Sequence, residues 1–188
     1  METLRTDRLL LRPLVNQDLD DLAYLYAQPI LMQYITGHPL VYEQVRDGLR
    51  QQVMQHEQYS FGFCAVIFRA TGALIGRGGL KPGAAPNGIT GELSWLLSTD
   101  YWGRGLATEL GQASIEYGVT KLHLARIFAT AYRTNLASVR VMEKLGMHLV
   151  RADDEGVEYE VLQPRNLQSG SNVAPSSATT QKRSTENQ

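Results

Sequence analysis

The sequence of 188 residues contains a single cysteine, Cys64, so no disulfide can form within the chain. A disulfide-stabilised scaffold is therefore excluded, and a reducing compartment fits. Residues 1–12 mix acidic and basic side chains with leucines and lack the apolar core of a signal peptide. No apolar run approaches the roughly 20 residues that a transmembrane helix needs. We expect a cytoplasmic protein that has no membrane as a partner.

An excess of charge of one sign is also missing. The 18 basic and 19 acidic residues give a formal net charge of -1. A nucleic acid is not expected as the main partner, because no basic field would attract its phosphates. The four histidines are scattered along the chain without metal-ligand spacing, so no metal site is predicted.

The composition is that of an ordinary globular domain, with 43% hydrophobic and 20% charged residues. It changes near the carboxyl end, where Ser, Thr, Asn and Gln dominate and apolar residues are few. We expect one domain over residues 1–165 and a disordered, low-complexity tail over residues 166–188, because such a tail cannot bury enough surface to offset its ordering entropy. Monomer and homodimer both stay open.

Periodicity predicts an α/β chain. Apolar runs bounded by turn residues indicate strands over 9–11, 61–68, 73–80, 89–98 and 126–132, and a last hairpin over 147–162. Helical spacing indicates helices after an N-cap at Asn16, over 42–53, from 106 onward and from Asn135 to about 145. Residues 81–88 hold two prolines and two glycines, which favours a loop.

A glycine-rich turn connects the strand that ends at Ser98 to the following helix. Gly103 and Gly105 would let the backbone approach an anion, and the helix start offers free N–H groups and a partial positive charge. The turn lacks the Lys-Ser/Thr pair of a Walker A loop. Thr108 stands where a dinucleotide fingerprint has its last glycine. An acyl-CoA pyrophosphate site is the third phosphate-binding interpretation.

The helix after this turn carries a stripe of small side chains. Its members, spaced four, three and four residues apart, are Ala107, Gly111, Ser114 and Gly118. This spacing places them on one helix face. The stripe predicts that the helix lies close against a sheet.

Three segments together resemble one protein family. They are Glu92–Leu97 with Tyr101–Glu109, then Asn135-x-x-Ser138 with Glu143–Met147, and the opening Thr6–Pro13. They cover about residues 3–163 in the right order and resemble the GNAT superfamily of N-acetyltransferases, most of all the branch of the RimJ/RimL ribosomal-protein N-terminal acetyltransferases. The resemblance implies a mixed, mainly antiparallel sheet of six or seven strands flanked by helices, in which two central strands splay apart.

The resemblance further implies acetyl-CoA as cofactor and a primary amine as acceptor. The amine would belong to a protein N-terminus or, alternatively, to an antibiotic, a polyamine or an amino acid. Pantetheine would pair with the strand edge at Trp95, Leu96 and Leu97. Asn135 and Ser138 would contact the cofactor. The pyrophosphate would lie on the backbone of Gly103, Arg104, Gly105, Leu106, Ala107 and Thr108, and Trp102 would also contact the cofactor.

Acetyl transfer requires a neutral amine, whereas an α-amine has a pKa near 8 and a lysine one near 10.4. Glu92 is our candidate base, although an exposed strand carboxylate without a role is an equal alternative. Glu158 and Glu160 on the last strand are further candidates. Ser138 is the candidate that orients or protonates the thiolate, but it and Asn135 could also serve only to cap a helix.

Two positions depart from the family pattern. Trp102 stands where the superfamily has Gln or Arg, a variant common in the RimJ/RimL-like branch. Met142 stands where many members have a tyrosine that protonates the departing thiolate, and methionine cannot donate a proton. That role would pass to another group or to water. A non-catalytic acyl-CoA sensor and a nucleotide-binding protein are the competing hypotheses.

Overall fold

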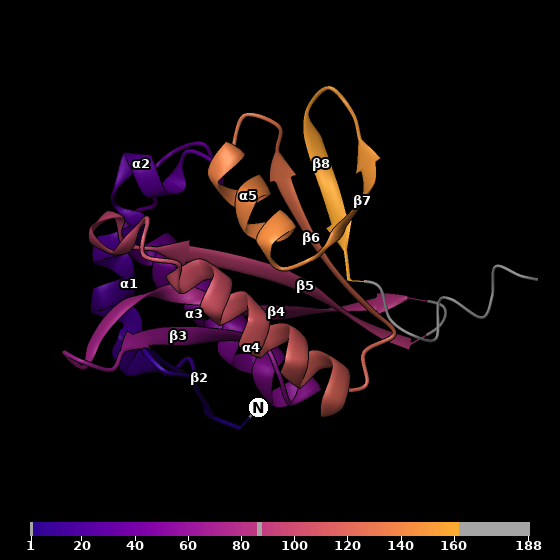
Figure 1. Cartoon of the computed structure of the whole chain (residues 1–188). Helices are drawn as coiled ribbons and strands as arrows, with labels where there is room; N and C mark the ends of the chain where they lie inside the picture. Colours follow the sequence, from indigo (N-terminus) through magenta and orange to yellow (C-terminus); the bar gives the residue numbers. More distant parts are fainter. Residues whose placement is uncertain (1, 86–87, 162–188) are drawn as a thin grey trace, which may run out of the picture.

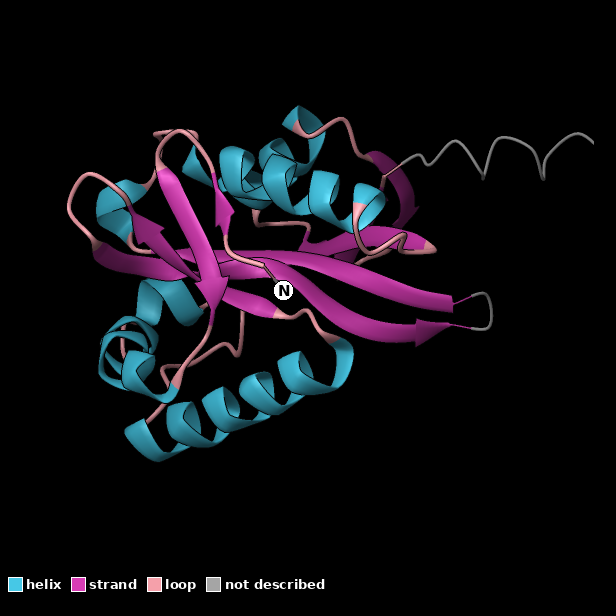
Figure 2. Ribbon diagram, turned by 90° about the horizontal axis from the view of Figure 1, so that it is seen from below, coloured by secondary structure: helices cyan, strands magenta, loops and turns pink. Residues whose placement is uncertain are grey.

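One mixed sheet organises the chain, with helices on both of its faces (Figures 1 and 2). The computed structural model describes residues 2–85 and 88–161. The tail expected over residues 166–188 lies outside these ranges. Within them, no helix is long and apolar enough to cross a membrane.

The sheet has eight strands: β1 (Leu4–Arg5), β2 (Leu9–Pro13), β3 (Phe63–Phe68), β4 (Ala73–Ala85), β5 (Gly88–Leu97), β6 (Arg126–Tyr132), β7 (His148–Ala152) and β8 (Gly156–Glu160). Their spatial order is β1-β2-β3-β4-β5-β6-β8-β7. Every neighbouring pair is antiparallel except β5 and β6, which run parallel. The predicted mixed, mainly antiparallel fold is confirmed, and the strand beyond the expected seven is the two-residue β1.

The helices are α1 (Leu19–Tyr26), α2 (Pro29–Met32), α3 (Tyr42–Tyr59), α4 (Leu106–Thr120) and α5 (Leu136–Lys144), with 3-10 turns over Asn16–Asp18 and Thr99–Tyr101. Figure 2 shows α4 and α5 on one side of the sheet and α1 with α3 on the other. Alternate side chains of each strand face the two helix layers. Leu93 and Leu97 of β5 thus enter the core beneath α4, while Leu96 enters the core beneath α1–α3.

The hairpin of β4 and β5 is longer than expected. Lys81 to Ala85 do not form a loop but pair with β5, and this pairing continues as far as Ala85 opposite Gly88. β3 stops pairing with β4 at Gly79. This part of β4 therefore has one free edge, where the missing N–H of Pro82 removes no ladder hydrogen bond. The loop prediction was wrong because proline ends a strand only where both edges are paired.

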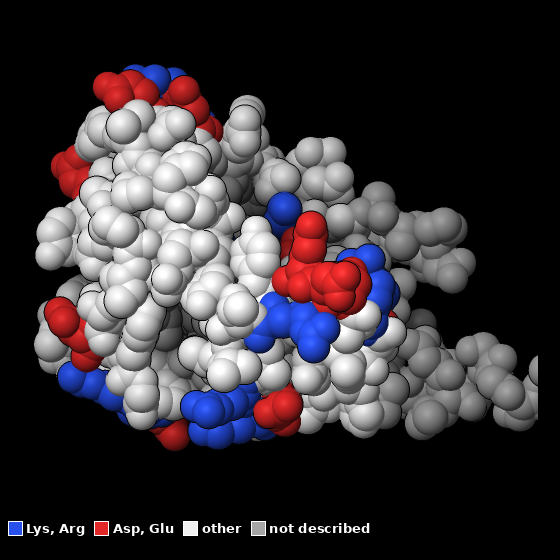
Figure 3. Space-filling model, turned by 90° about the horizontal axis from the view of Figure 1, so that it is seen from above, with Lys and Arg blue, Asp and Glu red and all other residues white. Residues whose placement is uncertain are grey.

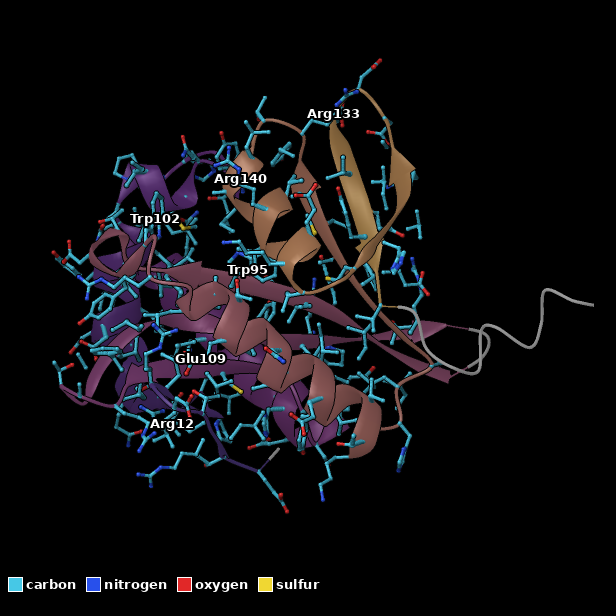
Figure 4. All side chains as sticks on the ribbon, viewed as in Figure 1. Arg12, Trp95, Trp102, Glu109, Arg133 and Arg140 are labelled. Atoms are coloured by element: carbon cyan, nitrogen blue, oxygen red, sulfur yellow. The ribbon has the colours of Figure 1, made fainter. Side chains whose placement is uncertain are left out.

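The predicted cap at Asn16 was also wrong, since Asn16 begins the 3-10 turn before α1. Asp18, only 4% exposed, holds this turn instead. Its carboxylate accepts a hydrogen bond from the Val15 N–H at 2.9 Å and pairs with the Arg12 guanidinium at 2.6 and 2.8 Å. A buried carboxylate needs such partners, and Arg12 on β2 (Figure 4) supplies the charge.

The small-residue stripe of α4 lies against its neighbours, as predicted. A Cβ added at Gly118 would stand 2.7 Å from Ile127 Cδ1 and 2.8 Å from Leu80 Cδ1, both on the sheet. A Cβ at Gly111 would stand 2.6 Å from Leu145 Cδ1, at the end of α5. These distances are shorter than carbon–carbon contact allows, so the glycines permit α4 to approach both the sheet and α5.

Glu109, in the first turn of α4, connects the helix start to the turn before β2 (Figure 4). Its Oε1 accepts hydrogen bonds from Thr6 Oγ1 at 2.5 Å and from the Arg8 N–H at 2.8 Å, and Arg8 Nε lies 2.7 Å from Oε2. Arg8 also donates to the Arg104 carbonyl at 2.8 Å. Burial raises the pKa of Glu109, but these hydrogen bonds and the Arg8 charge outweigh it, so the pKa lies below its usual value.

Replacing Glu109 by Gln should therefore destabilise the fold in a pH-dependent way. We expect a loss of about 1–2 kcal/mol at pH 7, because the charge-assisted hydrogen bonds weaken. A carboxylate with a lowered folded-state pKa stabilises fully above its unfolded pKa of about 4.3, and the contribution disappears as the pH falls through the folded value. Urea unfolding of both proteins between pH 7 and pH 3 measures this.

The exposed carboxylate of Asp100 provides the control, since Asp100→Asn should change stability little at any pH. A Glu109→Gln deficit that stayed constant down to pH 3 would show that the charge of Glu109 does not contribute.

Candidate active site

The parallel strands β5 and β6 separate along their length. They pair only where Thr90, Gly91 and Glu92 face residues 126–128. Beyond this point β5 stays paired with β4 and β6 with β8, but the two strands diverge, as Figure 1 shows. The predicted splay is confirmed. It leaves the inner edge of β5 beyond Glu92 without a strand partner. Another extended chain can add to such an edge through hydrogen bonds.

The turn before α4 has the backbone of an anion-binding loop. Gly103 and Gly105 have φ angles of +72° and +74°, a region that favours glycine. Gly105 occupies the N-cap position, where no side chain accepts a hydrogen bond from the first turn of α4. The free N–H groups and the helix dipole therefore suit an anionic group, and a pyrophosphate fits this arrangement.

Both tryptophans of the motif hold the structure together (Figure 4). The indole N–H of Trp102 donates to the Leu97 carbonyl at 2.7 Å and so fastens the turn to the end of β5. Trp95 packs against the core beneath α4. Leu96 and Leu97 are 4% and 5% exposed, so both residues are buried and their side chains contribute to the two cores.

A cleft of about 490 Å³ lies where the strands diverge. Residues from the segment after α2, from β3 to β6 and from the β7–β8 turn line it, among them Tyr34, Arg77, Glu92, Ser94, Thr130 and Tyr132. The rings of Tyr34 and Tyr132 lie 6.1 Å apart, and the Tyr34 hydroxyl donates to the Thr134 carbonyl at 3.3 Å. These contacts join the segment after α2 to the end of β6.

Glu92 lies in this cleft, at the last position where β5 pairs with β6. Its Oε1 accepts a hydrogen bond from Thr130 Oγ1 of β6 at 3.2 Å, and its Oε2 lies 3.7 Å from Lys81 Nζ. The side chain is 31% exposed. A carboxylate in this position is accessible and can accept a proton from a group that enters the cleft.

The alternative carboxylates on β8 have another environment. Glu160 Oε2 lies 2.8 Å from Arg126 Nε, and Glu158 binds Nη2 of the same guanidinium. Neither residue lines the cleft. Of the three candidate bases, the structure brings only Glu92 to the cleft, while Glu158 and Glu160 balance the charge of Arg126.

Asn135 and Ser138 lie at the start of α5, on the same side of the sheet as the turn before α4 (Figure 1). Asn135 Oδ1 accepts a hydrogen bond from the Ser138 N–H at 3.2 Å, so the predicted cap is confirmed. Their contact with a cofactor stays a prediction. Met142, fully buried, belongs to the core beneath α4 and α5 and fills the position by packing.

Several cleft residues were not singled out from the sequence. Arg77 left a usable signal, because it is the one charged residue in the apolar and glycine-rich run 73–80. Thr130 left none, since a hydroxyl on a strand is common and only the tertiary structure brings it next to Glu92. The face seen from above carries acidic and basic side chains next to one another (Figure 3), in keeping with the balanced charge of the sequence.

Comparison with known proteins agrees with this geometry. A family model described as an acetyltransferase (GNAT) domain matches residues 8–148. The uncharacterized N-acetyltransferase p20 of Bacillus licheniformis is 31% identical over 146 residues, which cover 77% of this chain and 82% of p20.

Solved structures share the fold. An acetyltransferase from Agrobacterium tumefaciens superposes with a TM-score of 0.74 at 27% identity, over 87% of this chain and 95% of the other. RimL, a ribosomal L7/L12 α-N-protein acetyltransferase solved with coenzyme A, superposes with a TM-score of 0.72 at 14% identity, over 86% and 98%. At that identity, RimL supports the fold alone. The match of the family model over most of the chain shows that this protein belongs to the GNAT family of acetyltransferases.

Proposed function

We propose that this protein transfers the acetyl group of acetyl-CoA to a primary amine. The observation that carries the proposal is the separation of β5 from β6 between an anion-binding turn and a cleft that holds a carboxylate. Acetyl-CoA would reach the split from the turn before α4, and the amine would reach it through the cleft. The two substrates would then meet beside Glu92.

The residues for acetyl-CoA are those of the turn and of the open strand edge. Backbone N–H groups from Gly103 to Thr108 would bind the pyrophosphate. The backbone of β5 at Trp95 to Leu97 would pair with the amides of pantetheine. Asn135 and Ser138 would add hydrogen bonds from the start of α5. Acetyl-CoA supplies the thioester, and the protein positions its carbonyl group.

Starting from an ammonium group, the nitrogen must lose two protons, one before the attack and one as the amide forms, and the sulfur must gain one. The second proton from the nitrogen replaces the one delivered to the sulfur, so the net proton released is the one that the base takes. Glu92 would take the proton from the incoming ammonium group, directly or through water. The amine nitrogen then attacks the thioester carbonyl carbon, a C–N bond forms, the C–S bond breaks and CoA leaves as the thiol. Backbone N–H groups of β5 would stabilise the charge on the carbonyl oxygen. Ser138 or water would protonate the sulfur, because Met142 cannot.

Release of the CoA thiol, measured across peptides with different N-termini and across small amines, tests this function. The resemblance to the RimJ/RimL branch favours a peptide N-terminus, and the alternative is a small amine. The buried Met142 is the observation that favours a second candidate, an acyl-CoA sensor. A sensor would show no thiol release with any amine while acetyl-CoA still raised the melting temperature.

Replacing Glu92 by Gln should lower kcat/KM about 10²- to 10⁴-fold at pH 7, because the general base is lost. The deficit should shrink above about pH 8, where an α-amine is increasingly neutral without help. A pH–rate profile measures this. Glu160→Gln is the matched control and should keep the wild-type profile. If Glu160→Gln instead lost activity and Glu92→Gln kept it, the base would belong to β8.

Replacing Gly105 by Glu should weaken CoA binding by about 100-fold or more, since a carboxylate would repel the pyrophosphate. Both Glu and Ala strain the backbone at a φ of +74°, so Gly105→Ala is the matched control for strain. Calorimetric titration with CoA measures the affinities. Normal affinity in Gly105→Glu would refute this placement of the pyrophosphate, and equal losses in both variants would assign the effect to the backbone.

A further inference from the structure

Arg77 of β4 is a buried cation in the wall of the cleft. The residue is 8% exposed and lines the cavity together with Phe63 and Glu92. Its Nε donates to the Tyr26 hydroxyl at 2.7 Å, and its guanidinium carbon lies 4.1 Å from the centre of the Phe63 ring. Two neighbours from other elements therefore hold the guanidinium in one orientation.

Part of this guanidinium has no protein partner. Among the described residues, Nη1 of Arg77 is buried and makes no hydrogen bond. None of the ion pairs in that part of the chain includes Arg77 either. Arg126 of β6, which lies outside the cleft, pairs by contrast with two carboxylates. A phenol and an aromatic ring do not neutralise the charge of Arg77.

A buried and uncompensated charge is unfavourable, and arginine stays protonated throughout the physiological pH range. An anion that entered the cleft would offset this cost. The planar guanidinium suits a carboxylate, which accepts hydrogen bonds from its N–H groups. An uncharged carbonyl would satisfy the hydrogen bond but not the charge.

We propose that the acceptor is a small amine that also carries a carboxylate, and that Arg77 binds this carboxylate in the cleft. The inference rests on the proposed acetyl transfer and narrows its substrate. The amine would lie near Glu92 and the carboxylate near Arg77, so that the two ends of the molecule meet groups of opposite charge. The cleft of about 490 Å³ is within the range of small-ligand sites.

Strand register sets the separation of the two groups. Arg77 faces Leu96 across the β4–β5 pair, and Lys81 faces Glu92. Arg77 and Lys81 are four residues apart along β4, as are Glu92 and Leu96 along β5. This spacing corresponds to about 13 Å between the Cα atoms of each pair. All of these side chains lie on the same face of the sheet because they are an even number of residues apart. The site can therefore select the spacing between amine and carboxylate as well as their charge.

Matched acceptors test the proposal on the unmodified protein. Glycine, β-alanine, 4-aminobutanoate and 6-aminohexanoate would each be compared with its carboxamide and with the corresponding alkylamine. We expect kcat/KM, measured by CoA thiol release, to be about 10- to 100-fold higher for the carboxylate at the best spacing. Equal rates for carboxylates and carboxamides at every spacing would overturn the proposal, as would a preference for uncharged peptides.

Variants assign the preference to Arg77. In Arg77→Gln the kcat/KM for the carboxylate should become about equal to that for its carboxamide. Arg126→Gln should keep the preference for the carboxylate, since Arg126 lies outside the cleft. Arg77→Lys keeps the charge without the planar donors and should retain a reduced preference for the carboxylate. This variant also tests the proposal if Arg77→Gln does not fold. A purely structural role would lower both rates together and leave their ratio unchanged.

A binding measurement separates this proposal from the proposed reaction. With CoA present, 6-aminohexanoate should raise the melting temperature more than its carboxamide does, and Arg77→Gln should abolish the difference. Carboxylate-selective stabilisation without thiol release would refute the acetyl transfer but keep the anion site. Thiol release without any carboxylate selectivity in rate or stabilisation would keep the reaction and refute the site.

Discussion

The loss of pairing between β5 and β6 is the constraint on which the site depends. A sheet normally satisfies its backbone N–H and C=O groups through neighbouring strands. Here β4 and β8 keep the outer edges of β5 and β6 paired, while their inner edges separate after Glu92 and Phe128. The strands are thus held rigidly from outside, and their open edges become available to a substrate without loss of the fold.

The two helix layers keep this opening in place. On one side, Gly111 and Gly118 bring α4 close to α5 and the sheet, and Glu109 fixes the start of α4 to the turn before β2. This side holds the glycine turn. On the other side, Tyr26 of α1 orients Arg77 within the cleft. Each layer thus positions a different binding element, and the split in the sheet lies between them.

Local patterns predicted features whose cause is also local. The turn at Gly103 and Gly105 and the cap at Asn135 depend on a few neighbouring residues, and the sequence indicated both. Predictions failed where a distant partner decides the outcome. Pro82 lies within β4 because β3 no longer pairs there, and Asp18 replaces Asn16 at the start of α1 because Arg12 reaches it from β2.

The sequence by itself determined the α/β class, the order of the longer elements, the glycine-rich turn and the family resemblance, because each depends on periodicity or on spacing along the chain. Only the tertiary structure distinguished Glu92 from Glu158 and Glu160, since all three are strand carboxylates in the sequence. Glu158 and Glu160 pair with Arg126, whereas Glu92 lines the cleft. The tertiary structure alone also placed Arg77 beside Tyr26, a residue of α1. Contacts between distant segments decide which charges are neutralised, and such contacts produce no periodic pattern in the sequence.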